Sequence, residues 1–397
     1  MERTKSSIAF VGLHAHSVAG SPFDGFGYPQ EHMDYAYENG CTALALTDHG
    51  NMNGLSHQIL HAKKMKEEGK DFKPIFGVEA YFVPSVEEWK EAYEKAKEDK
   101  KTARDLESDP TKTANEDEGA SKRKSDNIIR TRRHLILLAQ NQTGLNNIFK
   151  MISTSFQGDN FYRYPRVDYS LLKEHNEGII AASACLGGVY AGNYWDNCIY
   201  EEYEDEETGK TKSKKIGENE EAIANAMRKT TKNMVDIFGD RWFGELQWNN
   251  VPEQHRLNQY VIKMHEEFGI NLISTADSHY PTPTAWKDRE LYKRLGFLNR
   301  PNKPEWMTSE LPIDVDEIGD QMWESYKKYS EEYGYKYDDQ VVYDSLTTTH
   351  WIAHELIEDF MPDDTVRLPG FVVPEGQTAT QALARACITG LTELGFS

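Results

Sequence analysis

The stretch IAFVGLHAHS, residues 8–17, joins a short apolar run to two histidines that follow it directly. The run from Ile8 to Leu13 has the length of a buried strand, and His14 and His16 stand where that strand would end. This pattern is typical of an α/β protein whose functional groups gather at the carboxyl edge of its sheet. The same pattern should therefore recur along the chain.

Six further apolar runs of strand length follow. Helix-like stretches lie between many of them, and two of these, 54–69 and 253–269, are amphipathic and end on Gly, as helices commonly do. Strands that alternate with helices predict a parallel α/β barrel or an open α/β sheet. The expected strands, with the first run included, are 8–13, 43–47, 74–78, 135–139, 178–183, 242–246 and 271–276.

Composition excludes several classes of protein. The chain has 397 residues, 38% hydrophobic and 28% charged, as expected for a globular protein with a sizeable core. It contains no apolar run of about 18 residues, so we expect no membrane-spanning helix, and its start lacks the apolar core of a signal peptide. Its 4 scattered cysteines are too few for a disulfide framework, which favours a cytoplasmic protein.

The net charge of −20 argues against a chain that grips duplex DNA by itself, because such proteins usually carry a basic face. An acidic chain can still act on nucleic acid when bound metal ions supply positive charge, or when another polypeptide holds the DNA. The charge is therefore compatible with a metal-dependent phosphoesterase.

Two polar stretches interrupt the alternation of strands and helices. Residues 86–130 and 201–222 are rich in Lys, Glu and Asp and poor in large apolar side chains, so we expect solvated insertions that are partly disordered. Near residue 286 the pattern changes to aromatic-rich helices. We therefore predict one domain over residues 1–285 and a smaller, mainly helical segment over residues 286–397.

Side chains that can bind metal stand mostly where the expected strands end. In α/β barrels the carboxyl ends of the strands form the face at which catalytic groups converge. His134 is the exception, because it stands just before its strand. The candidate residues are His14, His16, Asp24, Asp48, His49, Glu79, His134, Cys185, Asp277 and His279.

This set exceeds what one tetrahedral zinc ion needs and suits two or three divalent ions, with Zn, Mn or Fe fitting mixed imidazole and carboxylate ligands. Such a cluster supplies hydroxide near neutral pH and stabilises a phosphoryl transition state. Each pair alone is more often a surface or core pair, and Cys185 alone is more often a small buried hydrophobic residue. The joint occurrence at five strand ends favours the metal site.

At these residues the chain resembles the polymerase and histidinol phosphatase (PHP) superfamily, and most closely the PHP domain of the bacterial DNA polymerase III alpha subunit. The resemblance implies a distorted seven-stranded α/β barrel. The matching stretches follow the family's order from residue 8 to about residue 285: FVGLHAHS, ALTDHGNMNG, KPIFGVEAYFVP, HLILLAQNQTGLNNIFKMIS, PRVDYSLLKEHNEGIIAASACLGG and ISTADSHY.

The resemblance also implies a metal site and an activity. Every metal-binding position of the family holds a residue able to bind metal here, which implies a working 3′–5′ exonuclease that proofreads at the 3′ end of DNA. Asp48 would then orient a ligand rather than bind metal. Carried over motif by motif, the ligands are His14, His16, Asp24, His49, Glu79, His134, Cys185, Asp277 and His279.

Residues 286–397 resemble the segment that leads into the polymerase palm, through HWIAHELIEDF and LPGFVVPEG. The family's glycine- and serine-rich nucleotide-binding stretch and its catalytic aspartate motif are absent from the chain. Asp314 and Asp316 are interpreted as acids at a helix start. We therefore expect no DNA synthesis by this chain alone, and as partners we expect the remaining polymerase polypeptide and the replication machinery.

Arg163 and Arg166, in FYRYPRVD, are candidates for holding a substrate phosphate, with a structural ion pair on the barrel rim as the alternative. Two other functions stay open for the whole chain. One is a stand-alone phosphatase of the same superfamily that acts on small phosphomonoesters. The other is a catalytically silent, metal-bound scaffold for the rest of the polymerase.

Overall fold

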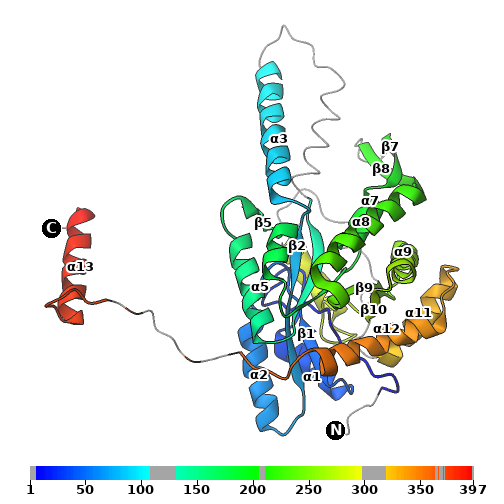
Figure 1. Ribbon diagram of the computed structural model, residues 1–397, viewed down its shortest axis with the longest axis horizontal. Helices are drawn as coiled ribbons and strands as arrows, with labels where there is room; N and C mark the ends of the chain where they lie inside the picture. Colours follow the sequence, from blue (N-terminus) through cyan, green and yellow to red (C-terminus); the bar gives the residue numbers. More distant parts are fainter. Residues whose placement is uncertain are drawn as a thin grey trace. The chain divides into compact units, whose positions relative to one another are not determined.

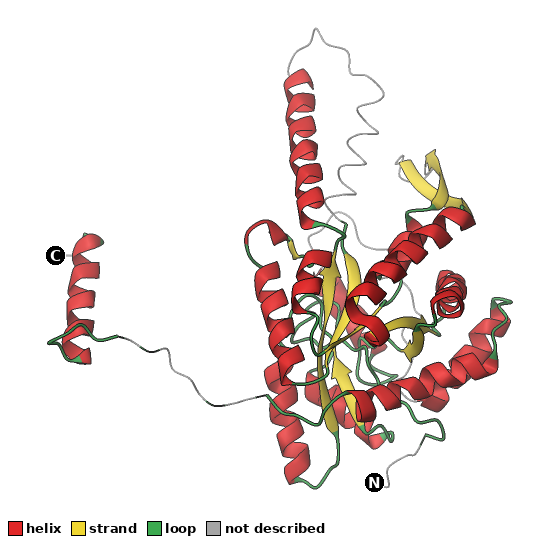
Figure 2. Ribbon diagram, in the orientation of Figure 1, coloured by secondary structure: helices red, strands yellow, loops and turns green. Residues whose placement is uncertain are grey.

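The computed structural model describes residues 6–107, 131–204, 211–296, 319–362, 365, 370 and 372–395. The chain divides into two compact units, Met1–Met361 and Pro362–Ser397. The larger unit has an α/β fold, in which helices surround a central sheet (Figures 1 and 2). Within the described residues, no helix is both long enough and apolar enough to cross a membrane.

The central sheet curls into a half-barrel of six strands, in the order β1-β2-β3-β6-β9-β10. All neighbouring strands are parallel except at β3, which runs antiparallel to β2 and to β6. We call the edge at which the parallel strands end, and at which β3 begins, the ligand edge. The strands are β1 (Ala43–Leu46), β2 (Lys73–Phe82), β3 (Arg133–Ala139), β6 (Ile179–Ala182), β9 (Trp242–Gln247) and β10 (Asn271–Thr275).

The predicted α/β fold is confirmed, but the expected distorted seven-stranded barrel was wrong: the sheet has six strands and is not closed, because the run 8–13 forms no strand. Its first backbone groups bond to helices instead: Ile8 N donates to Asp320 of α11 (Gly319–Glu332), and Val11 N donates to Thr349 of α12 (Asp339–Trp351). Only its end meets the sheet, through isolated bridges of Gly12 with Leu44 and of the following Ala15 with Ser278. One bridge on each side is not a ladder, so the sheet stays open between β1 and β10.

Helices connect the strands and cover the outer face of the sheet. Their ends follow local sequence: Asn219 accepts a hydrogen bond from Ala222 N where α8 begins, and Gly269 adopts a φ of 66° where α9 ends. The helices of the larger unit are α1 (Pro29–Glu38), α2 (Leu55–Glu67), α3 (Val86–Glu107), α5 (Gln142–Ser155), α6 (Tyr169–His175), α7 (Val189–Trp195), α8 (Glu220–Phe238), α9 (Pro252–Phe268), α10 (Trp286–Gly296), α11 (Gly319–Glu332) and α12 (Asp339–Trp351), with short 3₁₀ turns at Gly158–Asn160 and Gly239–Arg241 and a π-helix at Ile352–Leu356.

Both faces of the sheet are buried, as is usual for largely parallel strands. In β1, Leu44 and Leu46 face the helices, while Ala43 and Ala45 join a smaller apolar cluster inside the half-barrel. This alternation continues along the other strands, so the inner cluster also holds Ile75, Ile136 and Phe243. The inside of the half-barrel is therefore apolar away from the ligand edge.

The structure describes part of each expected insertion. Residues 86–107 form the helix α3, while 108–130 lie outside the described residues. The second stretch contains a two-stranded antiparallel hairpin of β7 (Cys198–Glu204) and β8 (Thr211–Glu218), most of whose side chains are exposed, and residues 205–210 lie outside the description.

The expected boundary near residue 286 stays a prediction. α12 packs against β10, and both belong to the larger unit. Asp314 and Asp316 lie outside the described residues. The smaller unit contains α13 (Ala379–Glu393), which begins with a capping box between Thr378 and Gln381.

Gly144, in the first turn of α5, supports a close backbone contact that can be tested. A methyl group at this position would overlap the carbonyl oxygen of Gly178, and backbone cannot move aside as a flexible side chain can. We expect Gly144→Ala to lower the free energy of unfolding by about 1–3 kcal/mol. Gly217→Ala, whose new methyl group would lie 3.6 Å from Ile199, is the control and should change it little. Urea denaturation measures both variants, and equal stability would contradict the packing described here.

Candidate metal centre

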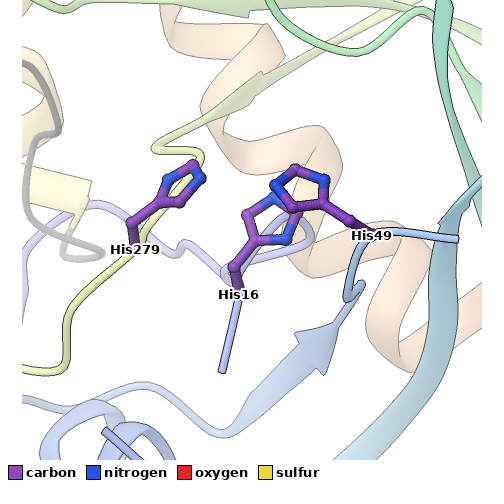
Figure 3. Close-up of side chains that lie close together, drawn as sticks. All are labelled: His16, His49 and His279. Carbon is purple, nitrogen blue, oxygen red and sulfur yellow. The ribbon is translucent and has the colours of Figure 1, made fainter. Parts of the chain in front are cut away.

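The candidate ligands lie together at the ligand edge and come from most strands of the sheet. Figure 3 shows three of them, His16, His49 and His279, with their rings close to one another. The rings of His16 and His49 stack at 4.1 Å between centroids, and those of His16 and His279 lie 4.4 Å apart. Segments more than 250 residues apart in sequence therefore meet here.

Glu79 stands at the centre of the cluster. It lies within β2, on the inner face, and is completely buried. Its Oε1 lies 2.6 Å from His49 Nδ1 and 2.8 Å from His134 Nδ1, and its Oε2 lies 2.8 Å from His14 Nε2 and 3.7 Å from His16 Nε2. One carboxylate thus touches four imidazoles, an arrangement suited to bridging two cations.

His134 reaches the cluster because β3 runs against its neighbours. The beginning of β3 lies at the ligand edge, where the parallel strands end, and Tyr81 of β2 pairs with His134 across the sheet. In the sequence, His134 was the exception because it stands before its strand. An antiparallel strand brings its first residues, and not its last, to the ligand edge, which explains this position. The Cys185 Sγ, in the loop after β6, lies 3.5 Å from His134 Nδ1.

Asp277 follows β10 and faces the two histidines of the first motif. Its Oδ1 is buried and lies 3.1 Å from the Nε2 of both His14 and His16. The backbone of Asp277 has a φ of 52°, a conformation unusual outside glycine and often found at functional sites. The fold thus holds this carboxylate in place at a cost in backbone strain.

These contacts fit a divalent ion better than they fit protons. His14 Nε2 lies 3.1 Å from His16 Nε2 as well as 2.8 Å from Glu79 Oε2, so several electron-rich atoms crowd together. A proton on His14 can serve only one of these contacts at a time, whereas a metal ion accepts electron pairs from all of them. The donor set therefore suits a metal centre.

Asp24 and His279 form the outer part of the cluster. Asp24 Oδ2 lies 3.1 Å from His49 Nε2 and 3.6 Å from His279 Nε2. Arg289 of α10 donates from Nε to the Asp24 carbonyl and from Nη2 to Asp24 Oδ1, which fixes the loop that carries this carboxylate. Three groupings of the described residues could each hold an ion: His16, His49 and His279; His14, His16, Glu79 and Asp277; and His49, Glu79 and His134.

Asp48 does not face the cluster but holds the loop that carries part of it. Its carboxylate accepts hydrogen bonds from Ser17 N at 2.7 Å, Ser17 Oγ at 2.9 Å and Ser21 Oγ at 2.9 Å. Ser21 Oγ in turn accepts from His49 N and lies 3.4 Å from His16 Nδ1. These bonds support the orienting role expected for Asp48.

Glu245 is a functional residue that the sequence analysis missed. It lies on the inner face of β9, and its Oε1 is 2.7 Å from His14 Nδ1. Gln247 and Thr275 donate to the same oxygen. A carboxylate behind a histidine fixes the ring and leaves its other nitrogen for metal. The signal was an acid within the apolar strand WFGEL, because a buried charge requires a partner.

The electrostatics of the cluster favour a bound cation. Burial lowers the pKa of His16 well below its usual value, and the imidazoles of His49 and His279 lower it further. His16 is therefore neutral at neutral pH, the form in which imidazole binds metal. Burial also raises the pKa of the Cys185 thiol, and nearby carboxylates add to this, so a thiolate forms here only beside a cation.

Two other imidazoles hold protons. Burial lowers the pKa of His14, but the carboxylates of Asp277 and Glu245 outweigh it and raise the pKa well above its usual value. The pKa of His49 is raised in the same way, chiefly by Glu79. The negative potential that holds these protons would also hold a metal ion, so the two compete.

The predicted phosphate-binding arginines lie near the cluster in different surroundings. Arg166 is completely buried, and its Nη1 donates to the carbonyls of Tyr162 and Tyr164. Its guanidinium also lies 3.9 Å from the ring of Trp89. These contacts with carbonyls and ring support a structural role for Arg166. Arg163 is exposed, with a φ of 60°, in the turn between β4 (Phe161–Tyr162) and β5 (Tyr164–Pro165). Whether Arg163 or Arg166 touches substrate stays a prediction.

A half-barrel with imidazoles and carboxylates converging at one edge defines a candidate metallohydrolase, and comparison with protein families identifies its class. Residues 12–247 match the PHP domain. The chain therefore belongs to the PHP domain family, which confirms the resemblance seen in its motifs.

Known relatives carry this domain within longer chains. The protein is 33% identical over 278 residues to "DNA polymerase III subunit alpha" of Aquifex aeolicus (strain VF5), covering 69% of this chain and 18% of that one. It is 28% identical over 392 residues to the protein of the same name from Thermus aquaticus, covering 97% of this chain and 26% of the relative. The chain thus spans about a fifth to a quarter of the length of these relatives.

One solved structure, a putative metal-dependent phosphoesterase from Bifidobacterium adolescentis, aligns over 70% of this chain and 91% of its own. The sequence identity is 13% and the TM-score 0.31, too low for any functional comparison.

Metal binding should release protons. His14, His49 and Cys185 are protonated at pH 7 in the chain alone, because their pKa values are raised, and each must lose a proton to bind metal. Affinity for Zn²⁺ or Mn²⁺ should consequently fall as the pH is lowered. Calorimetric titration at pH 7 in two buffers of different ionisation enthalpy measures the release, and equal heats in both buffers would contradict it.

Proposed function

We propose that the chain is a metal-dependent phosphoesterase that removes nucleotides from the 3′ end of DNA. The observation that carries the proposal is the contact of one buried carboxylate, Glu79, with four imidazoles at the ligand edge. Family membership supports the same reading, because the motifs that match the PHP domain supply most of these side chains.

The proposed ligands are nine residues, all within the described part of the chain. Two or three divalent ions, of Zn, Mn or Fe, fit this number and mixture of donors. When bound, such ions supply a hydroxide near neutral pH and stabilise the charge that develops on a phosphoryl group. The ligands are His14, His16, Asp24, His49, Glu79, His134, Cys185, Asp277 and His279.

Other residues of the chain prepare the site. Glu245 holds the His14 ring by Nδ1 and so directs Nε2 toward Glu79. Asp48 fixes the loop after the first motif, and Arg289 fixes Asp24. These contacts fix the orientation of the His14 ring and of the loop that carries Asp24.

Two other functions are alternatives to the exonuclease. A stand-alone phosphatase would act on small phosphomonoesters, and a silent scaffold would bind metal without turnover. The Thermus aquaticus relative matches 97% of this chain, including residues beyond the family match, which favours the polymerase setting over the phosphatase. The strained backbone of Asp277 favours a working site over a scaffold.

Activity should depend on Glu79. We expect Glu79→Gln to lose bound metal and to lower kcat/KM by about 100-fold or more, because the central charge is removed, and His134→Ala to act similarly. His57→Ala, an exposed change on α2, is the control and should leave activity unchanged. The assay is release of mononucleotides from a labelled, mismatched primer with Mn²⁺ or Zn²⁺, alongside elemental analysis.

The outcomes separate the three functions. Equal activity of wild type and Glu79→Gln would mean that the cluster is not the catalyst. Faster hydrolysis of small phosphomonoesters than of DNA would favour the phosphatase. Bound metal without any turnover of either substrate would favour the catalytically silent scaffold.

The proposed partners are the remaining polymerase polypeptide and the replication machinery. α13 exposes Leu383, Ile388 and Leu391, and Leu394 directly follows the helix; these side chains are 52 to 74% accessible, and such apolar surface favours a protein contact. We expect the chain to bind a co-expressed polymerase palm fragment, and Leu391→Asp with Leu394→Asp to weaken the complex at least 10-fold. Pull-down with purified components tests this, and a complex that tolerates both changes would exclude α13 from the contact.

A further inference from the structure

The inner face of β2 and β3 changes character step by step toward the ligand edge. On β2 the inward residues run from Ile75 to Glu79 and then Tyr81, and on β3 they run from Ile136 to His134. Tyr81 and His134 are directly paired across the two strands. Along the inner face of β2 and β3, apolar residues therefore come first, the candidate metal ligands Glu79 and His134 follow, and the Tyr81 ring stands at the ligand edge.

Arg132 extends this series by one step. It stands two residues before His134, and its guanidinium carbon lies 5.3 Å from the centroid of the Tyr81 ring. Tyr81 in turn lies nearly parallel to the ring of His49, with 6.2 Å between centroids and 12° between planes. The cation therefore lies one aromatic ring away from two proposed metal ligands, His49 and His134.

A strained turn holds Arg132 from the other side. Tyr164 lies under the guanidinium at 3.8 Å and meets the Tyr81 ring edge-on at 5.5 Å. Tyr164 follows Arg163, a non-glycine residue with a φ of 60° that makes the turn between β4 and β5. Arg166 fixes this hairpin through the carbonyls of Tyr162 and Tyr164. Backbone strain supported by a buried arginine is typical of a segment placed for function.

We propose that Arg132, rather than Arg163 or Arg166, binds the phosphate of the substrate at the ligand edge, beside the metal centre; this rests on the proposed phosphoesterase function. An arginine held by its flat face presents its N–H donors at its edge, the geometry that suits two phosphate oxygens. In a chain with a net charge of −20, a fixed cation at this point also counters the repulsion of an anionic substrate.

The alternative, that Arg132 only packs against the tyrosines, makes different predictions. The variants are Arg132→Gln and Arg132→Lys, with Arg133→Gln as the matched control. Arg133 is the adjacent residue, has the same charge and pairs with Asp196, an exposed residue, rather than with the tyrosines. Each metal-loaded variant is assayed for kcat and KM in nucleotide release, for affinity to thymidine 5′-monophosphate, and for metal content and Tm.

We expect Arg132→Gln to lower kcat/KM about 100-fold and to weaken thymidine 5′-monophosphate binding about 10-fold, with metal content unchanged. Arg132→Lys should restore part of both losses, because it keeps the charge without the paired donors, and Arg133→Gln should match wild type. Values for Arg132→Gln within twofold of wild type in both assays would overturn the proposal. So would loss of metal from this variant, because the residue would then serve the metal site rather than the substrate.

The two proposals fail in different ways. If metal-loaded wild type releases no nucleotides, the phosphoesterase function fails, and the nucleotide-binding comparison still decides the role of Arg132. If wild type is active and Arg132→Gln is equally active, only the inference about Arg132 fails. Wild type that neither releases nor binds the nucleotide would overturn both.

Discussion

The buried carboxylate of Glu79 is the constraint on which this structure depends. A charge placed on the inner face of a sheet, away from solvent, is unfavourable unless cations surround it. Burial raises the pKa of Glu79, yet the imidazoles of His134 and His49 outweigh this and hold it well below its usual value. The ligand edge meets this requirement, because four imidazoles, from His14, His16, His49 and His134, converge on this one side chain.

Much of this arrangement could be predicted from the sequence, because the signals were local. Short apolar runs marked all six strands of the sheet, and the ligand-bearing motifs stood beside them. The false seventh strand, 8–13, had the same local signal. Its backbone partners Asp320 and Thr349 lie more than 300 residues away in sequence, and no local pattern reveals them.

The remaining differences have the same origin. His134 was an exception only while every strand was taken as parallel, and strand direction is a property of the whole sheet. Glu245 was not predicted, because most predicted ligands follow an expected strand, whereas this acid lies within the strand β9. For Arg166 the prediction stays untested, but only the fold shows that its Nη1 donates to two backbone carbonyls.

The reversed direction of β3 also bears on how such a protein can diversify. Because β2 ends at Phe82 and β3 begins at Arg133, both at the ligand edge, the connection between them starts and finishes beside the metal centre. A connection that starts and finishes at one edge can lengthen, shorten or change composition without displacing a strand. Proteins that share this half-barrel can therefore differ in substrate preference through changes in this one connection, while the metal ligands stay the same.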